Sequence, residues 1–164
     1  MRLERIEQAI VTCQNHLSKN PAIEPEIEAF LTEYLLILIC AEFEAEVKKI
    51  IVKRSSLAND PILTKFVDSF SQGLVRSIQI SELEGLLNKF GAEYKKKFQE
   101  RLNDKEENKT RFSSIIANRH KVAHKAGTKS QMTLPELIES YNKGNIVLDI
   151  LSQVILESMS FKNA

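Results

Sequence analysis

The run Leu35-Leu36-Ile37-Leu38-Ile39-Cys40-Ala41 is apolar at every position. A helix that is apolar around its whole circumference packs against several neighbours at that level. We therefore expect a long central helix that begins at Glu24-Pro25 and runs to about Arg54, with the proline tolerated in its first turn. No apolar run in the chain reaches the ~18 residues that a membrane-spanning helix needs.

Six further helices are expected around this central helix, because apolar residues recur at helical spacing along the rest of the chain. Asp60-Pro61 is a helix start, and residues 81–84 and 133–136 each have the pattern of a capping box. In the last helix, Gly144 weakens the helical backbone and allows a kink. The expected ranges are 2–18, 61–71, 81–90, 92–102, 109–125 and 134 onward.

The chain has no period-two alternation of useful length and no internal repeat, so we expect an all-α fold. Four longer helices form a bundle, and residues 61–102 form a short-helix insertion. With 164 residues, 43% of them hydrophobic and 27% charged, the chain is expected to be one globular domain over residues 1–164. Cys13 and Cys40 lie far apart among apolar neighbours, which favours reduced core cysteines in a cytoplasmic protein. The N-terminal segment has no signal-peptide core.

The segment Ile116-Ala117-Asn118-Arg119-His120-Lys121-Val122-Ala123-His124 holds two of the three histidines of the chain. At about 100° per residue, an apolar stripe runs along this helix. Arg119 falls in the middle of the stripe, and His120 and His124 lie along one border. A guanidinium on an apolar face has to find an anion, because an unpaired buried charge is costly. The stripe consists of Phe112, Ile115, Ile116, Val122, Ala123 and Ala126.

An arginine and a histidine together can cleave RNA without a metal ion. The histidine accepts the proton of a ribose 2′-OH, which attacks the adjacent phosphorus, while the arginine stabilises the charge that develops on the phosphoryl oxygens. The products are a 2′,3′-cyclic phosphate and a 5′-OH. Arg119 and His124 are the candidates for these roles, and a second imidazole can come from His120 or from a second subunit. No metal and no cofactor is expected.

Two other interpretations of the same residues remain open. Arg119 can form a buried salt bridge, with the histidines as ordinary polar residues at a helix end. Alternatively, His120 and His124 share a helix face at i and i+4 and can bind a metal ion. No cysteine or acid lies between Glu107 and Glu136 to complete such a metal site.

The region around the motif is locally basic, because the acids stop at Glu107 and resume only at Glu136. Such a region suits a phosphate-bearing ligand, although a solvated helix face is the alternative interpretation. As the acidic partner of Arg119 we choose Glu44, which continues the apolar stripe of the central helix and is thereby drawn inward. The candidate RNA-binding residues are Arg111, Lys121, Lys125 and Lys129.

The spacing of Arg119 and His124 resembles the RX4-6H motif of HEPN domains. The motif sits late in an all-α chain and precedes one last long helix, as in that superfamily. The segment 35–44, Leu-Leu-Ile-Leu-Ile-Cys-Ala-Glu-Phe-Glu, is similar to its second helix. The resemblance is closest to the RiboL-PSP-HEPN subgroup, including Phe90-Gly91 and residues 133–141, and it covers nearly all of the chain.

This resemblance implies a metal-independent endoribonuclease of the kind found in toxin–antitoxin, phage-defence and RNA-processing systems. By match with the motif, Arg119 and His124 are catalytic and His120 is the polar residue of the motif, while Glu44 resembles the acid that follows the apolar run. HEPN proteins work as dimers with a composite site, so the implied partners are RNA, a second copy, and an antitoxin or nucleotidyltransferase protein. A non-catalytic HEPN module that binds RNA or a protein partner is the alternative.

A dimer is also favoured by the geometry of the motif helix itself. A single helix places positions 119 and 124 about 140° apart around its axis, which is awkward for one shared phosphate. Two such helices related by a two-fold axis bring residues of both subunits together.

Overall fold

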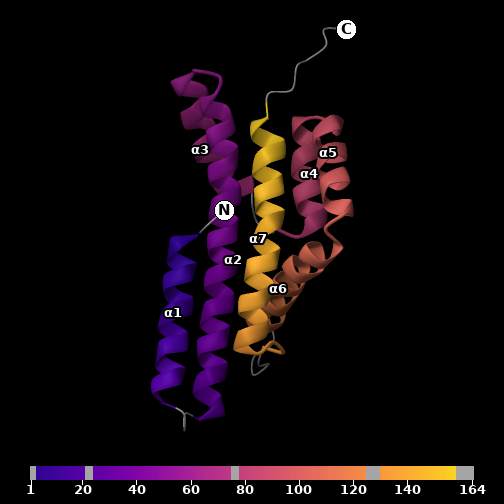
Figure 1. Cartoon of the computed structure of the whole chain (residues 1–164). Coiled ribbons are helices and arrows are strands. Elements are labelled where there is room, and N and C mark those ends of the chain that lie inside the picture. Colours follow the sequence, from indigo (N-terminus) through magenta and orange to yellow (C-terminus); the bar gives the residue numbers. More distant parts are fainter. Residues whose placement is uncertain (1–2, 21–23, 75–77, 125–129, 158–164) are drawn as a thin grey trace.

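A computed structural model describes residues 3–20, 24–74, 78–124 and 130–157, except for the side chains at positions 72, 74, 123 and 124. Over these ranges the chain forms seven helices and no strand (Figure 1), which confirms the expected all-α class. None of these helices combines enough length with enough apolar character to cross a membrane. The helices are α1 (Glu4–Lys19), α2 (Pro25–Ser56), α3 (Pro61–Leu74), α4 (Ile80–Phe90), α5 (Ala92–Asn103), α6 (Glu106–His124) and α7 (Leu134–Leu156).

The two long helices α2 and α7 run side by side in the same direction through the middle of the molecule (Figure 1). α1 packs antiparallel to α2 on one side, and α6 packs antiparallel to α7 on the other. The short helices gather at the opposite end of the molecule from the C-terminal end of α6 and the start of α7, with α3 against α2 and the α4–α5 pair beside α7. The expected bundle of four longer helices with a short-helix insertion is therefore confirmed.

The core between α2, α6 and α7 is built around three aromatic rings. The ring of Phe43 on α2 stacks on Phe112 of α6, with 5.6 Å between centroids, and on Tyr141 of α7, at 6.0 Å. Stacked aromatic pairs contribute beyond the area that they bury. These contacts fix the height of α6 along α2 and thereby the position of its C-terminal end, where the motif lies.

The sequence predicted that neighbours would cover the apolar run of α2 on every side. The structure leaves one side exposed. Most of its residues are buried by α1, α6 and α7, but Ile37 is 51% exposed. Phe30 and Tyr34, which share its helix face at i−7 and i−3, are 70% and 57% exposed. Three neighbouring helices of one chain leave this side of α2 open. We call Phe30, Tyr34 and Ile37 the α2 strip.

Two predicted helix starts are confirmed. At the start of α3, the Oδ1 atom of Asp60 accepts hydrogen bonds from the backbone N–H groups of Ile62 and Leu63, each 3.0 Å long. At the start of α7, Thr133 and Glu136 form the reciprocal capping box that their spacing predicted. These contacts satisfy backbone donors that a helix start otherwise leaves without an intrahelical partner.

Other helix starts differ from the prediction. The capping box expected at residues 81–84 does not form, because α4 already begins at Ile80, with Gln79 as an N-cap whose side chain makes no capping hydrogen bond. Ile78, just before this helix, is 1% exposed, and its burial fixes where the chain enters α4. α6 also begins about a turn earlier than expected, at Glu106, where a helix favours acidic residues.

Gly144 allows α6 and α7 to pack closely, and α7 continues through it as one helix. A Cβ atom at position 144 would lie 3.2 Å from the Cα atom of Phe112 and 3.3 Å from its backbone nitrogen. We expect Gly144→Ala to lower the free energy of unfolding by about 1–3 kcal/mol, because α6 and α7 must separate to admit the methyl group. Chemical denaturation monitored by circular dichroism measures this effect.

Gly85 provides the matched control, since a Cβ atom there would meet nothing within 4 Å. Gly85→Ala is expected to raise the free energy of unfolding by up to about 1 kcal/mol through helix propensity alone. Equal stabilisation by both substitutions would contradict the close packing of α6 on α7.

Candidate functional site

The motif lies at the C-terminal end of α6, and the inward face of this helix is the apolar stripe that the sequence predicted. Arg119 is half-buried and continues this stripe one turn further along the helix. Ala123 and Ala126, which were expected to extend it, lie outside the described side chains. The described members are Phe112, Ile115 and Ile116, which are buried, and Val122, which packs at the edge of the core.

The charges of Arg119 and Glu44 both shift the pKa of the buried Cys40 thiol, on the face of α2 that α6 approaches. Burial raises the pKa of the Cys40 thiol to about 12, while the positive charge of Arg119 lowers it and the negative charge of Glu44 raises it. Because such effects weaken with distance, both charged groups lie near this thiol. The packing of α6 on α2 thus brings the two candidates into one region of the molecule.

The ion pair expected between Arg119 and Glu44 is, however, not formed. Glu44 is half-buried and lines a surface groove along α2 of about 760 Å³, together with Ala41 and Lys48. Water in this groove can solvate the carboxylate, so it does not require the guanidinium as a partner. We chose Glu44 because the sequence predicted that it faces inward. Since it is only half-buried, that prediction is only partly correct.

Among the described residues, no ion pair or hydrogen bond joins Arg119 to another group. A guanidinium that is partly withdrawn from water gains most from an anion that accepts two parallel hydrogen bonds, such as a phosphate or a carboxylate. None of the described side chains engages its planar donor fork in this way.

The two histidines of the motif are only partly described. His120 follows Arg119 directly and is half-buried. α6 ends at His124, whose side chain lies outside the described part of the chain, as do Lys125 and Lys129. The expected catalytic role of His124 and the expected RNA contacts of the two lysines stay predictions.

The two described basic candidates have different surroundings. Arg111 is half-buried between α6 and α7, where its guanidinium lies 3.2 Å from the carboxylate of Glu139. A hydrogen bond from Lys143 and the charge of Arg111 lower the pKa of Glu139. Lys121 is exposed at the motif end of α6, and its Nζ donates a 2.7 Å hydrogen bond to Gln131. Arg111 thus contributes to helix packing, whereas Lys121 lies at the surface beside the motif.

Glu33 is not among the residues that the sequence singles out, yet its side chain binds the backbone shortly before the start of α7. Its Oε1 atom accepts a 3.0 Å hydrogen bond from the backbone N–H of Ser130, at the end of the connection that follows α6. Together with the contact between Lys121 and Gln131, this bond ties residues 130 and 131 to α6 and to α2. No spacing or composition signal separates Glu33 from the other glutamates of α2, because the bond joins residues 97 positions apart in the chain.

No group of three or more histidine, cysteine or acidic side chains in the described ranges is arranged to hold a metal ion. The family model described as RiboL-PSP-HEPN matches residues 1–157 of the chain. This range includes all seven helices, and with them both Glu44 on α2 and the motif on α6. Comparisons with curated proteins and with solved structures give no match.

Proposed function

Because the chain belongs to the RiboL-PSP-HEPN family, we propose that this HEPN module is a metal-independent endoribonuclease. The observation that carries the proposal is the state of Arg119, a half-buried guanidinium with no acidic partner among the described residues. A residue that only stabilises the fold would be expected to pair with an acid, because an uncompensated charge is costly to bury. An RNA phosphate supplies the missing anion.

In the proposed reaction, the imidazole of His124 takes the proton of a ribose 2′-OH, and this oxygen attacks the adjacent phosphorus. Arg119 stabilises the charge on the non-bridging phosphoryl oxygens as the bond to the 5′-oxygen breaks. A second imidazole, from His120 or from another subunit, protonates the leaving 5′-oxygen. The products carry a 2′,3′-cyclic phosphate and a 5′-OH, and no bond to the protein is formed.

We further propose that the active form is a homodimer. The exposed α2 strip of Phe30, Tyr34 and Ile37 supports this proposal, because contiguous apolar surface is a common mark of a protein interface. Ile37 lies one turn before Cys40, and the charge of Arg119 lowers the pKa of the Cys40 thiol. Burial of this strip by a second copy would bring the two motifs close to one interface, where residues of both subunits can share a phosphate.

Cleavage of single-stranded RNA in excess EDTA tests the proposed function. We expect the purified protein to cleave at the same rate with EDTA as with added Mg²⁺, because the chemistry requires only an imidazole and a guanidinium. Loss of cleavage in EDTA, restored by a divalent metal ion, would contradict the mechanism. Tight RNA binding without any cleavage would instead support a non-catalytic HEPN module.

A further inference from the structure

A second surface feature adjoins the motif on the same helix. A groove of about 350 Å³ lies between the start of α4 and the middle of α6. This volume is at the lower end of the range for small-ligand sites, about 300–1,000 Å³. None of the candidate catalytic residues lines it. Its lining residues are Gln79, Ile80, Ser81, Ser113, Ile116 and Ala117, and we call it the α4–α6 groove.

The groove leads along α6 towards the motif. Ser113, Ala117 and His120 follow one another at i, i+4 and i+7, which places them on one face of the helix. His120 therefore lies on the same face of α6, about one turn beyond the groove residue Ala117. Ile116, which also lines the groove, lies one turn before Arg119. A ligand in the groove can thus extend to the guanidinium and imidazole of the motif.

The chemistry of the groove differs from that of the motif beside it. None of the described residues that line it is ionisable, so these residues offer no charge to attract a phosphate. Gln79, Ser81 and Ser113 carry neutral groups that can both donate and accept hydrogen bonds. Ile80, Ile116 and Ala117 add apolar surface. A flat, neutral ligand with donors and acceptors along its edge fits such a lining.

We propose that the α4–α6 groove binds an unpaired nucleobase of the RNA next to the cleaved phosphodiester. Single-stranded RNA is recognised through splayed-out bases that are stacked and hydrogen-bonded along their edges. With the phosphate at Arg119, the neighbouring base is the part of the RNA that is near enough to enter the groove. This inference rests on the proposed function, and it adds a preference for the identity of one base.

The test uses a pool of single-stranded RNAs with randomised sequence, followed by sequencing of the cleavage fragments. We expect the wild-type protein to prefer one base, or one class of base, at a single position beside the cut. Ala117→Leu fills the groove from an exposed position of α6, so the fold should be retained. It is expected to reduce this preference by about tenfold while the chemical ends of the fragments stay the same.

Ser113→Ala removes one hydroxyl from the groove and should change which base is preferred, with a smaller effect. Ala92→Leu makes the same replacement as Ala117→Leu at an exposed position on α5, and is expected to leave the preference unchanged. Cleavage with the same base preference in the wild type, Ala117→Leu and Ser113→Ala would overturn the groove assignment and leave the proposed nuclease function intact.

If the wild-type protein cleaves no RNA, the nuclease proposal fails. The proposal that the groove binds a nucleobase is then tested by measuring RNA affinity. Fluorescence anisotropy then compares 2′-O-methyl oligonucleotides that differ in one base. A base-dependent affinity that falls in Ala117→Leu but not in Ala92→Leu would support the groove. Affinity that does not depend on the base, or no binding at all, would overturn it.

Discussion

Replacement of His124 by alanine is expected to lower the rate of RNA cleavage by about 100- to 10,000-fold. This is the range that a single general acid or base contributes, and alanine has no group that can accept the proton of the 2′-OH. The affinity for a non-cleavable RNA should change little, since Arg119 and the surrounding backbone remain. The measurement is the single-turnover rate on a labelled single-stranded RNA at saturating protein.

His16→Ala is the matched control, because His16 is exposed at the C-terminal end of α1. It makes the same replacement outside the motif and should leave the rate unchanged. Expression in a bacterial host gives an independent comparison, in which the wild type is expected to slow growth and His124→Ala is not. Cleavage at the wild-type rate by folded His124→Ala protein would show that His124 is not the catalytic group.

Replacement of Arg119 by alanine is expected to lower the cleavage rate by about 100- to 1,000-fold, because one donor group to the developing phosphoryl charge is lost. The free energy of unfolding should fall by no more than about 1 kcal/mol, since no described acid pairs with Arg119 and would lose its partner. Arg119→Lys keeps the charge but not the planar donor fork, so its rate should lie between those of the wild type and Arg119→Ala.

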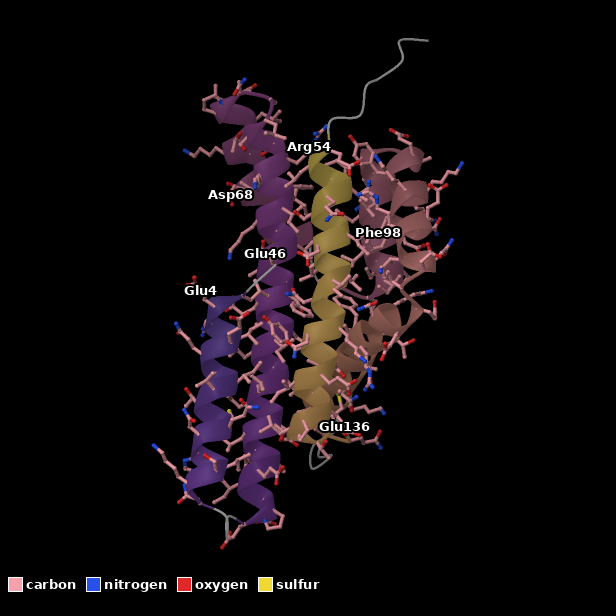
Figure 2. All side chains as sticks on the ribbon, in the orientation of Figure 1. Glu4, Glu46, Arg54, Asp68, Phe98 and Glu136 are labelled. Atoms are coloured by element: carbon pink, nitrogen blue, oxygen red, sulfur yellow. The ribbon has the colours of Figure 1, made fainter. Side chains whose placement is uncertain are left out.

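This pair of measurements also separates the catalytic role of Arg119 from a purely structural one. If Arg119 formed a buried salt bridge, Arg119→Ala would cost about 3–5 kcal/mol of stability. Arg54 is the control, a half-buried arginine near the C-terminal end of α2 (Figure 2). Its guanidinium donates a 3.2 Å hydrogen bond to the hydroxyl of Tyr94. Arg54→Ala should lower the free energy of unfolding, because the hydrogen bond to Tyr94 is lost, and leave the cleavage rate unchanged.

Much of the fold follows from local patterns in the sequence. The long helix α2, the N-cap at Asp60 and the capping box at 133–136 each follow from neighbours in the chain, and the structure confirms them. The exposure of Ile37 and the true start of α4 depend on which helices cover which side. Such contacts are set by packing between distant segments, which periodicity along one helix cannot specify.

In the candidate site, too, some features follow from local sequence patterns and others depend on contacts between distant segments. The position of Arg119 within the stripe of α6 follows from the helical repeat, and its half-buried state agrees with that prediction. Its relation to Glu44 depends on the distance between α2 and α6, so the sequence could identify the region but not the missing ion pair. The hydrogen bond from Ser130 to Glu33 joins residues 97 positions apart, and it has no sequence signature.

The central claim is that RNA is cut through its own 2′-OH with the help of Arg119 and His124. The most direct test is to determine the fragment ends of an RNA that carries a single 2′-deoxy nucleotide at one cleaved position. We predict 2′,3′-cyclic phosphate and 5′-OH ends at every other cut, and no cut at the deoxy position. Cleavage at the deoxy position, or fragments with 5′-phosphate and 3′-OH ends, would contradict this mechanism.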